Sequence, residues 1–255
     1  MNQKIFICED SLDGIMTALH EALYSGIDRE YLKICIGDEG NFTLFSEYIY
    51  VETDPEKAEK TAHMLRLRLG AEGYYGICHA AMSFEEDKAD AILGMVMTGL
   101  SMKDGRMVMD HISDKAVGRV FELSRTVSNE AHHHLGFIRF RELKNGVLLS
   151  EITPKNDILT LVAPHFEDRL GCEDWMIYDR NRSLFAVHRR GSRWGIVSGE
   201  TLDMDRAAEL SEREEEFQDL WKRFCSSVSI RERENTELQQ QNLPLRFRKN
   251  MTEFE

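Results

Sequence analysis

Hydrophobic positions recur at helical spacing near the start of the chain. An apolar stripe begins after a possible N-cap at Asp10 or Ser11 and stops before Gly26, which is a favourable residue just beyond a helix end. The members of this stripe are Leu12, Ile15, Met16, Leu19 and Leu23. The spacing therefore predicts an amphipathic helix that follows a short opening strand, "KIFICED".

Three further amphipathic segments occupy residues 53–70, 85–100 and 113–134. The first of them has a capping aspartate followed by a proline and closes on Gly70, a pattern that is typical of helix boundaries. Together with the opening helix, these segments predict a mainly helical portion over residues 1–134.

The pattern changes near residue 135, where short β-rich runs replace the helical spacing. These runs are "GFIRFREL", "NGVLLSEI", "DWMIYDR", "SLFAVHRR" and "RWGIVSG". A helix broken or kinked at Pro164 separates the second run from the third, and an acidic helix and a basic, aromatic tail follow the last run. We therefore predict an α+β fold, in which a helical N-terminal portion precedes a mainly antiparallel β-sheet flanked by helices over residues 135–255. No clear linker divides these parts, so we expect one compact unit.

The first two β-rich runs meet at Asn145-Gly146, which favours a two-residue hairpin turn. With such a turn, Arg141 would lie opposite Ser150, and Arg139 would lie on the same face as Arg141, about 7 Å away. That spacing is close to the distance between phosphates along a nucleic-acid strand. From the spacing alone, a solvated face with ion pairs to nearby carboxylates is the simpler interpretation.

Charge is unevenly distributed along this chain of 255 residues, which has a net charge of −13. Residues 1–131 carry 13 basic and 23 acidic side chains, whereas residues 139–193 carry 10 basic and 8 acidic ones. The overall charge argues against a protein that coats nucleic acid indiscriminately, and any polyanion site should lie in the second half.

Other classes of protein are disfavoured by simple features of the sequence. Five dispersed cysteines without a C-x-x-C pair do not suggest a disulfide framework or a zinc ribbon. The start of the chain shows no signal-peptide pattern, and no apolar run approaches the roughly 20 residues that span a bilayer. We therefore expect a cytoplasmic protein with no membrane partner.

Three adjacent histidines, His132, His133 and His134, raise the question of a metal site. Adjacent side chains on a helix point about 100° apart, whereas paired helical ligands need a spacing of three or four residues. A helix end, where cationic imidazoles complement the dipole, is the simpler interpretation. We predict no metal and no other cofactor, and His132 remains the one weak metal candidate.

Cationic and aromatic side chains in the second half are candidates for nucleic-acid binding, because arginine and lysine contact phosphates and aromatic rings stack on bases. These candidates are Arg139, Arg141, Arg169, Trp175, Tyr178, Arg180, Arg182, Arg246, Arg248 and Lys249. The tail that carries the last three could equally dock on the domain through its apolar residues.

A catalytic role is a separate possibility. His165 and Asp168 lie three residues apart on an expected helix, where a carboxylate could hold the imidazole of a general base, and His188 is a further candidate. No serine or cysteine nucleophile occurs in a recognisable elbow, and an ion-pair network explains the same residues. Whether the protein is an enzyme stays open.

The order of several motifs resembles an uncharacterised bacterial family, the probable DNA metabolism or putative DNA repair proteins (domain of unknown function 4130). The motifs are E-A-H, G-F-x-R-F, P-H-F-x-D-R and W-x-I-x-D, and the opening "FICEDSLDGIMTALHEA" and closing "LPLRFRKNMTEF" are similar as well. The resemblance singles out Glu130, His132, Gly136, Phe137, Arg139, Phe140, Pro164, His165, Phe166, Asp168, Arg169, Trp175 and Asp179. His133 and His134 fall outside the family pattern.

The resemblance implies a link to DNA, because members are typically encoded beside a radical SAM protein and some are fused to a uracil-DNA glycosylase domain. Three hypotheses follow. The protein is a nucleic-acid-binding component, most simply binding DNA, that works with a radical SAM partner. Alternatively, it is an adaptor for that enzyme without direct nucleic-acid binding, or it is a nucleic-acid hydrolase that uses the His–Asp pair.

Overall fold

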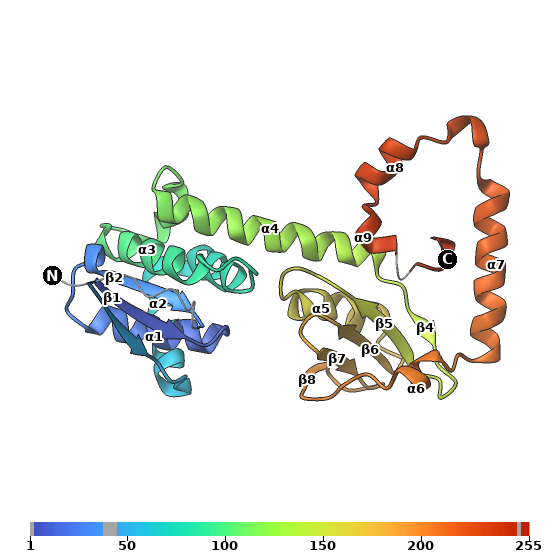
Figure 1. Cartoon of the computed structure of the whole chain (residues 1–255), viewed down its shortest axis with the longest axis horizontal. Helices are drawn as coiled ribbons and strands as arrows, with labels where there is room; N and C mark the ends of the chain where they lie inside the picture. The colour runs from blue at the N-terminus through green and yellow to red at the C-terminus, as the bar shows by residue number, and fades with distance from the viewer. Residues whose placement is uncertain (1–2, 38–44, 249–250, 255) are drawn as a thin grey trace. The chain divides into compact units, whose positions relative to one another are not determined.

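The computed structural model describes residues 3–37, 45–248 and 251–254, and its chain divides into two compact units (Figure 1). Unit 1 comprises residues 1–129 and unit 2 comprises residues 130–255. Helix α4 (Lys115–Phe137) begins in unit 1 and ends in unit 2. Within the described residues, no helix is both long and apolar enough to cross a bilayer.

Unit 1 contains a three-stranded parallel sheet as well as the expected helices. Its strands are β1 (Gln3–Cys8), β2 (Leu32–Ile36) and β3 (Ser46–Tyr50), in the order β2-β1-β3. Only the first strand was predicted from the sequence. The two others are short, and they pair in parallel with β1, so residues far apart in the chain define them.

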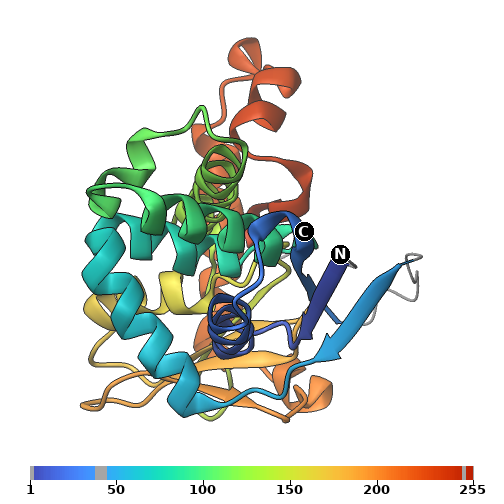
Figure 2. The same ribbon diagram turned by 90° about the vertical axis from the view of Figure 1, so that its left-hand side faces the viewer.

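The helices of unit 1 follow their sequence signals closely. In α1 (Leu12–Tyr24), the side chain of Ser11 accepts a hydrogen bond from the Gly14 amide at 3.0 Å, which confirms the predicted N-cap. Helix α2 (Pro55–Ala81) starts at its proline and is interrupted at Gly70, whose φ of 72° belongs to the left-handed region. The predicted end at Gly70 is therefore confirmed, but a second helical segment resumes directly after it. In Figure 2, α1 is seen nearly end-on beside the strands of unit 1.

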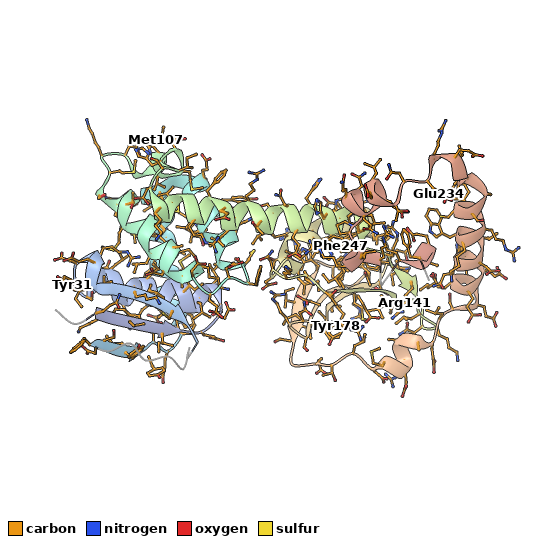
Figure 3. The ribbon with its side chains drawn as sticks, turned by 45° about the horizontal axis from the view of Figure 1, so that its top comes forward. Tyr31, Met107, Arg141, Tyr178, Glu234 and Phe247 are labelled. Carbon is orange, nitrogen blue, oxygen red and sulfur yellow. The ribbon has the colours of Figure 1, made fainter. Side chains whose placement is uncertain are left out.

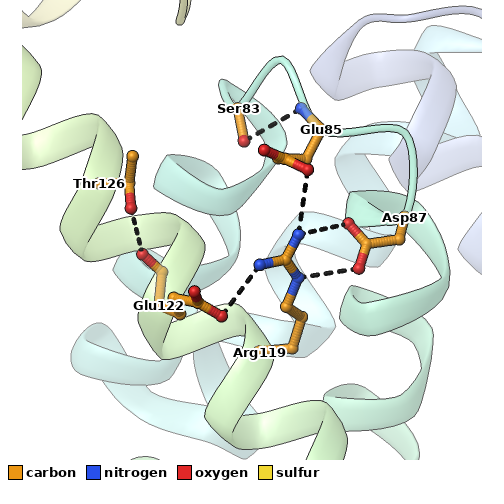
Figure 4. A network of polar contacts seen from close by, with 6 residues as sticks. All are labelled: Ser83, Glu85, Asp87, Arg119, Glu122 and Thr126. Atoms are coloured by element: carbon orange, nitrogen blue, oxygen red, sulfur yellow. Dashed lines mark hydrogen bonds and ion pairs between the residues drawn. The ribbon is translucent and has the colours of Figure 1, made fainter.

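A buried apolar core joins α1, α2 and α3 (Lys88–Ser101) to the sheet and to the first half of α4. Arg119 of α4 adds a polar connection to the loop before α3 (Figure 4). Its guanidinium forms two hydrogen bonds with Asp87, at 2.8 and 2.9 Å, and further bonds with Glu122 at 2.9 Å and Glu85 at 3.2 Å. The bonds from Arg119 hold the pKa of the Asp87 carboxyl below its usual range.

Unit 2 is built on a five-stranded sheet of order β4-β5-β6-β7-β8. Its strands are β4 (Arg141–Glu142), β5 (Leu148–Ile152), β6 (Trp175–Asp179), β7 (Leu184–His188) and β8 (Gly195–Ser198). Strands β5 and β6 are parallel and are joined through α5 (Leu159–Arg169), whereas the remaining neighbours are antiparallel. The predicted α+β fold with a mainly antiparallel second half is confirmed. Helix α5 is not broken at Pro164 but continues through it.

The predicted hairpin register is wrong by one residue. The Leu143 amide donates to the Val147 carbonyl at 2.9 Å, so the loop has three residues, and Arg141 lies opposite Leu149. Gly146, with a φ of 81°, supplies the single left-handed residue that such a loop requires. Because α4 continues to Phe137, Arg139 precedes the strand, and the two arginines do not form the predicted pair on one strand face.

Several short helices follow the sheet and complete unit 2. They are α6 (Met204–Ala208), α7 (Glu212–Val228), α8 (Thr236–Asn242) and α9 (Leu245–Arg248). The acidic helix predicted over residues 204–228 is therefore two helices, because the chain leaves helical geometry at Glu209, and Leu210 pairs with Leu143. The Ser211 side chain then caps α7.

Candidate nucleic-acid interface

Five of the predicted arginines gather around the end of β5 and the loop that follows it, residues 153–156. We call them the β5 arginine cluster: Arg139, Arg141, Arg180, Arg182 and Arg246. Arg141 comes from β4, Arg180 and Arg182 lie in the β6–β7 turn, and Arg139 and Arg246 lie near the two ends of unit 2. Arg141 and Phe247, a neighbour of Arg246, are labelled in Figure 3.

Glu151 on β5 lies between two members of the cluster. It forms an ion pair with Arg141, and its second oxygen lies 3.4 Å from Nε of Arg180. The carboxylate side chain is only 9% exposed, whereas the two guanidinium groups are partly open to solvent. Glu151 therefore orients both arginines from below the surface.

Asp179 plays the same part for Arg182. The aspartate at the end of β6 is fully buried, and its Oδ2 lies 3.1 Å from Nη1 of Arg182. Arg182 also donates hydrogen bonds to the carbonyl oxygens of Pro154 and Lys155, which ties it to the loop after β5. Burial raises the pKa of Asp179, and the Arg182 charge opposes that rise.

Glu130, the first residue of the E-A-H motif, anchors the loop and the tail at once. Its buried carboxylate accepts hydrogen bonds from the backbone amides of Lys155 at 3.2 Å and Asn156 at 2.8 Å, and from the Asn156 side chain at 2.7 Å. Nη1 of Arg246 lies 3.4 Å away. The motif glutamate is therefore a structural residue that joins α4, the loop after β5 and α9.

The fifth arginine is held by the C-terminal tail. Nη2 of Arg139 donates to Glu253 at 3.1 Å, and Nη1 donates to the carbonyl oxygens of Gly136 at 3.0 Å and Ile138 at 3.2 Å. The other oxygen of Glu253 accepts a hydrogen bond from the Trp221 indole at 3.2 Å.

The ion pairs share one arrangement, in which the carboxylate is buried or nearly buried and the guanidinium is partly exposed. Side-chain exposure is 0–13% for the four acids and 24–46% for the five arginines. A guanidinium has five N–H donors in a rigid fork, so a pair with one carboxylate leaves donors for another ligand. With five cations against four anions, the cluster has a small positive excess at a site of fixed geometry.

A small pocket lies within the cluster, with a volume of about 20 Å³ that suits a single water molecule. Its lining residues are His134, Phe137, Ile138, Arg139, Glu151, Ile152, Thr153, Arg246 and Phe247. The pocket as packed is too small for a base or a nucleotide, so a nucleic acid would contact the outer side of the arginines.

His134 is the buried titratable group of this pocket. Burial lowers its pKa from the ordinary 6.5 to about 4; the charges of Arg246 and His133 act in the same direction, while that of Glu130 opposes them. The Phe247 ring packs edge-on against the imidazole, with ring centres 4.9 Å apart. His134 therefore belongs in the core at neutral pH as an uncharged ring.

The two aromatic candidates are in the interior. Trp175 is fully buried and stacks on His188 with ring centres 5.1 Å apart, and Tyr178 is buried and stacks on Phe185 at 4.4 Å. Their interpretation as base-stacking surfaces does not fit this burial. Both rings pack inside unit 2 from β6, where they stabilise the sheet.

The three catalytic candidates are not assembled into a site. The His165 ring packs edge-on against the Phe166 ring, with ring centres 5.1 Å apart, and Asp168 is exposed. His188 is buried, and its Nδ1 lies 2.9 Å from the Glu173 carbonyl oxygen, so it donates there when that nitrogen carries the proton. In the part of the chain that the structure describes, no hydrogen bond joins any two of these three candidates.

The remaining candidates are not members of the β5 arginine cluster. Arg169 is exposed in the last turn of α5, where its charge complements the helix dipole. Arg248 donates to the Leu243 carbonyl at 3.3 Å and lies over the Phe254 ring at 4.7 Å, and Lys249 falls outside the described residues. His132 is exposed in the last turns of α4, and no group of three or more potential metal ligands occurs among the described residues.

Sequence reasoning missed two of the four anchoring acids, Glu151 and Glu253. Glu151 could have been suspected, because a charged residue within an apolar strand requires a partner. Glu253 gives no local signal, since it meets Arg139 across 114 residues of sequence.

Comparisons with known proteins place the chain in a family. A solved structure described as a DHH domain from a family of ribosomal proteins matches over 74% of each chain, at 10% identity and a TM-score of 0.31. That score is too low to indicate a shared fold or function. No curated protein matches the chain. The family model for the domain of unknown function DUF4130 matches residues 86–253, which include α3, α4 and nearly all of unit 2. The chain therefore belongs to the DUF4130 family.

Proposed function

We propose that unit 2 binds nucleic acid, most simply DNA, through the β5 arginine cluster. In this proposal the protein is the nucleic-acid-binding component of a DNA metabolism or repair system and works with a radical SAM partner. The observation that carries the proposal is the arrangement of five partly exposed arginines, each paired with a buried or nearly buried carboxylate.

The arrangement suits phosphate because it lowers the entropic cost of binding. A free arginine side chain must give up rotamer freedom when it grips a phosphate, whereas a buried carboxylate behind the guanidinium has already restricted it. Planar guanidinium groups also match phosphate oxygens with two parallel hydrogen bonds. The resemblance of the motifs to DNA metabolism proteins supports nucleic acid over other polyanions.

The same carboxylates limit the affinity. Four anions offset most of the charge of the five arginines, so the cluster attracts a polyanion only weakly at a distance. We expect a log–log salt slope of roughly −1 to −3, smaller than the value of about −4.5 for five uncompensated contacts.

The test is fluorescence anisotropy with labelled single- and double-stranded DNA and RNA, from roughly 25 to 200 mM salt. Arg139→Gln and Arg180→Gln each remove one cation of the cluster. In the first variant Trp221 still bonds Glu253, and in the second Arg141 still pairs with Glu151, so neither carboxylate loses all its partners. Each variant should bind roughly five- to tenfold more weakly, with a salt slope lower by about 1. Arg206→Gln, at an exposed arginine of α6, is the matched control and should bind like the wild type.

Two results would refute the proposal. One is the absence of DNA or RNA binding at the lowest salt, both with and without the radical SAM partner. The other is binding that neither Arg139→Gln nor Arg180→Gln weakens while circular dichroism shows both variants to be folded.

An adaptor role is a second candidate, supported by the acidic excess of the first 131 residues, 23 acidic against 13 basic side chains. Such a surface could dock a basic partner without nucleic acid. Co-expression with the radical SAM protein, followed by nuclease treatment and pull-down, distinguishes the two roles. A complex that survives the nuclease favours the adaptor, and loss of the complex favours nucleic acid as the bridge.

A further inference from the structure

Helix α7 carries an apolar face that the rest of unit 2 leaves about half exposed. Its members are Phe217, Leu220, Trp221, Phe224 and Val228, and we call them the α7 face. Their spacing of three, four and seven residues places them on one side of the helix. Each is between 43% and 60% exposed, and no residue of α7 is buried.

The side of α7 that turns toward the unit is a different one. Glu214 accepts a hydrogen bond from the Glu142 amide at 3.1 Å, and Gln218 donates to Glu214 at 2.8 Å. With Cys225, these residues are only partly exposed and form a row beside the α7 face. Trp221 lies at the border between the two sides, since its indole reaches Glu253. The α7 face therefore adjoins the side that contacts unit 2 and remains accessible to another helix.

The α7 face is comparable in size with the largest apolar patch of a typical monomer, and such patches often have a function. Three aromatic rings and two aliphatic side chains, each about half exposed, present on the order of 400 Å² of apolar surface. Two such faces that overlapped fully would bury roughly 800 Å², which is below the roughly 1,000 Å² of a specific, stable interface. When the acidic half of one helix faces the basic half of another, the faces overlap only around Phe217, Leu220 and Trp221, which suits a weak, transient dimer.

The charges of α7 indicate which helix fits. Residues 212–219 carry five acidic side chains and one basic side chain, whereas residues 220–228 carry two basic side chains and no acidic one. A second α7 in antiparallel orientation would place each acidic half opposite a basic half. A parallel pair would place like halves together, which is unfavourable.

A particular pair of side chains makes this complementarity testable. Glu216 and Arg223 are seven residues apart, so they lie on the same flank of the α7 face, on the side away from Gln218. In a two-fold antiparallel pair, equal flanks of the two helices meet. Glu216 of one copy would then lie near Arg223 of the other copy, twice over.

We propose that the α7 face is the interface of a homodimer, in which the α7 helices of two copies pair antiparallel through their apolar faces and their complementary ends. The proposal does not depend on nucleic-acid binding.

Sedimentation velocity of the full-length protein, from about 1 to about 200 µM, tests this inference. The wild type should shift from monomer to dimer with a dissociation constant in the micromolar range. Leu220→Glu should weaken association at least tenfold. Leu67→Glu, an equally exposed leucine on α2 in unit 1, is the matched control and should associate like the wild type.

Charge exchange then identifies the partner helix. Glu216→Arg and Arg223→Glu should each weaken self-association, because each opposes like charges twice in the pair. An equimolar mixture of the two variants, or the double variant, should restore the dimer. A wild-type monomer at the highest concentration would refute the proposal, as would a dimer that is insensitive to Leu220→Glu or a mixture that does not recover.

Discussion

Protonation of His134 should destabilise unit 2 in mild acid. The imidazole is buried among Glu130, His133, Arg246 and the Phe247 ring, and its pKa falls from the ordinary 6.5 to about 4. Between these pH values the unfolded chain binds a proton that the folded chain does not. Stability therefore rises with pH in this window, and it is lost as the pH falls from 6.5 toward 4.

The magnitude follows from the change in pKa. Each pH unit corresponds to about 1.4 kcal/mol, so the fall from 6.5 to about 4 costs about 3 kcal/mol of unfolding free energy once the pH is below both values. This is a large share of the roughly 5–15 kcal/mol that stabilises a typical domain.

Urea unfolding followed by tryptophan fluorescence at pH values of about 7, 6, 5 and 4.5 measures the effect. All three tryptophans, Trp175, Trp194 and Trp221, lie in unit 2, so the signal reports on this unit. His134→Gln removes the proton site, and this variant should lose less stability than the wild type over the same pH range. His133→Gln, at an exposed neighbour, should follow the wild type. Equal losses in His134→Gln and the wild type would show that burial of His134 does not control the acid response.

Three further predictions concern packing and ion pairs. Glu130→Gln should lower the stability of unit 2 by about 2–3 kcal/mol in urea unfolding, because the amide replaces a buried charge that accepts three N–H bonds; no change would contradict its anchoring role. Gly136→Ala should stabilise the end of α4 by about 0.5–1 kcal/mol, since nothing lies within 4 Å of the added carbon. Gly94→Ala should destabilise unit 1, because the added carbon would lie 2.5 Å from Cβ of Ala116. Thermal unfolding measures both changes, and equal effects of the two substitutions would contradict the packing argument. Arg119→Lys should lower the stability of unit 1 by about 1 kcal/mol, because an ammonium cannot form the two parallel hydrogen bonds to Asp87. Hydrogen exchange in α3 and α4 should then be faster than in the wild type, and unchanged exchange would refute this prediction.

The local elements could be read from the sequence because their causes are local. Ser11 caps α1 and Gly70 interrupts α2 at the predicted positions, since capping and left-handed backbone depend on neighbouring residues only. Strands β5 to β8 fall within the predicted β-rich runs for the same reason.

Elements that depend on distant partners could not be read in the same way. Strands β2 and β3 exist as partners of β1 in a parallel sheet, and their short runs carry no strong pattern of their own. The hairpin register was missed by one residue, because the glycine of an Asn-Gly pair can also supply the left-handed residue that ends a three-residue loop.

For the candidate site, the sequence by itself determined that basic residues accumulate in the second half of the chain and which arginines are candidates for binding a polyanion. Only the tertiary structure decided that five of these arginines meet around β5 and that acids such as Glu151 and Glu253 pair with them. It also decided that the rings of Trp175 and Tyr178 are buried. The physical reason is that an ion pair or a buried ring is a relation between segments. Composition sets which charges are present, but the packing of α4, β5 and the tail sets which of them meet.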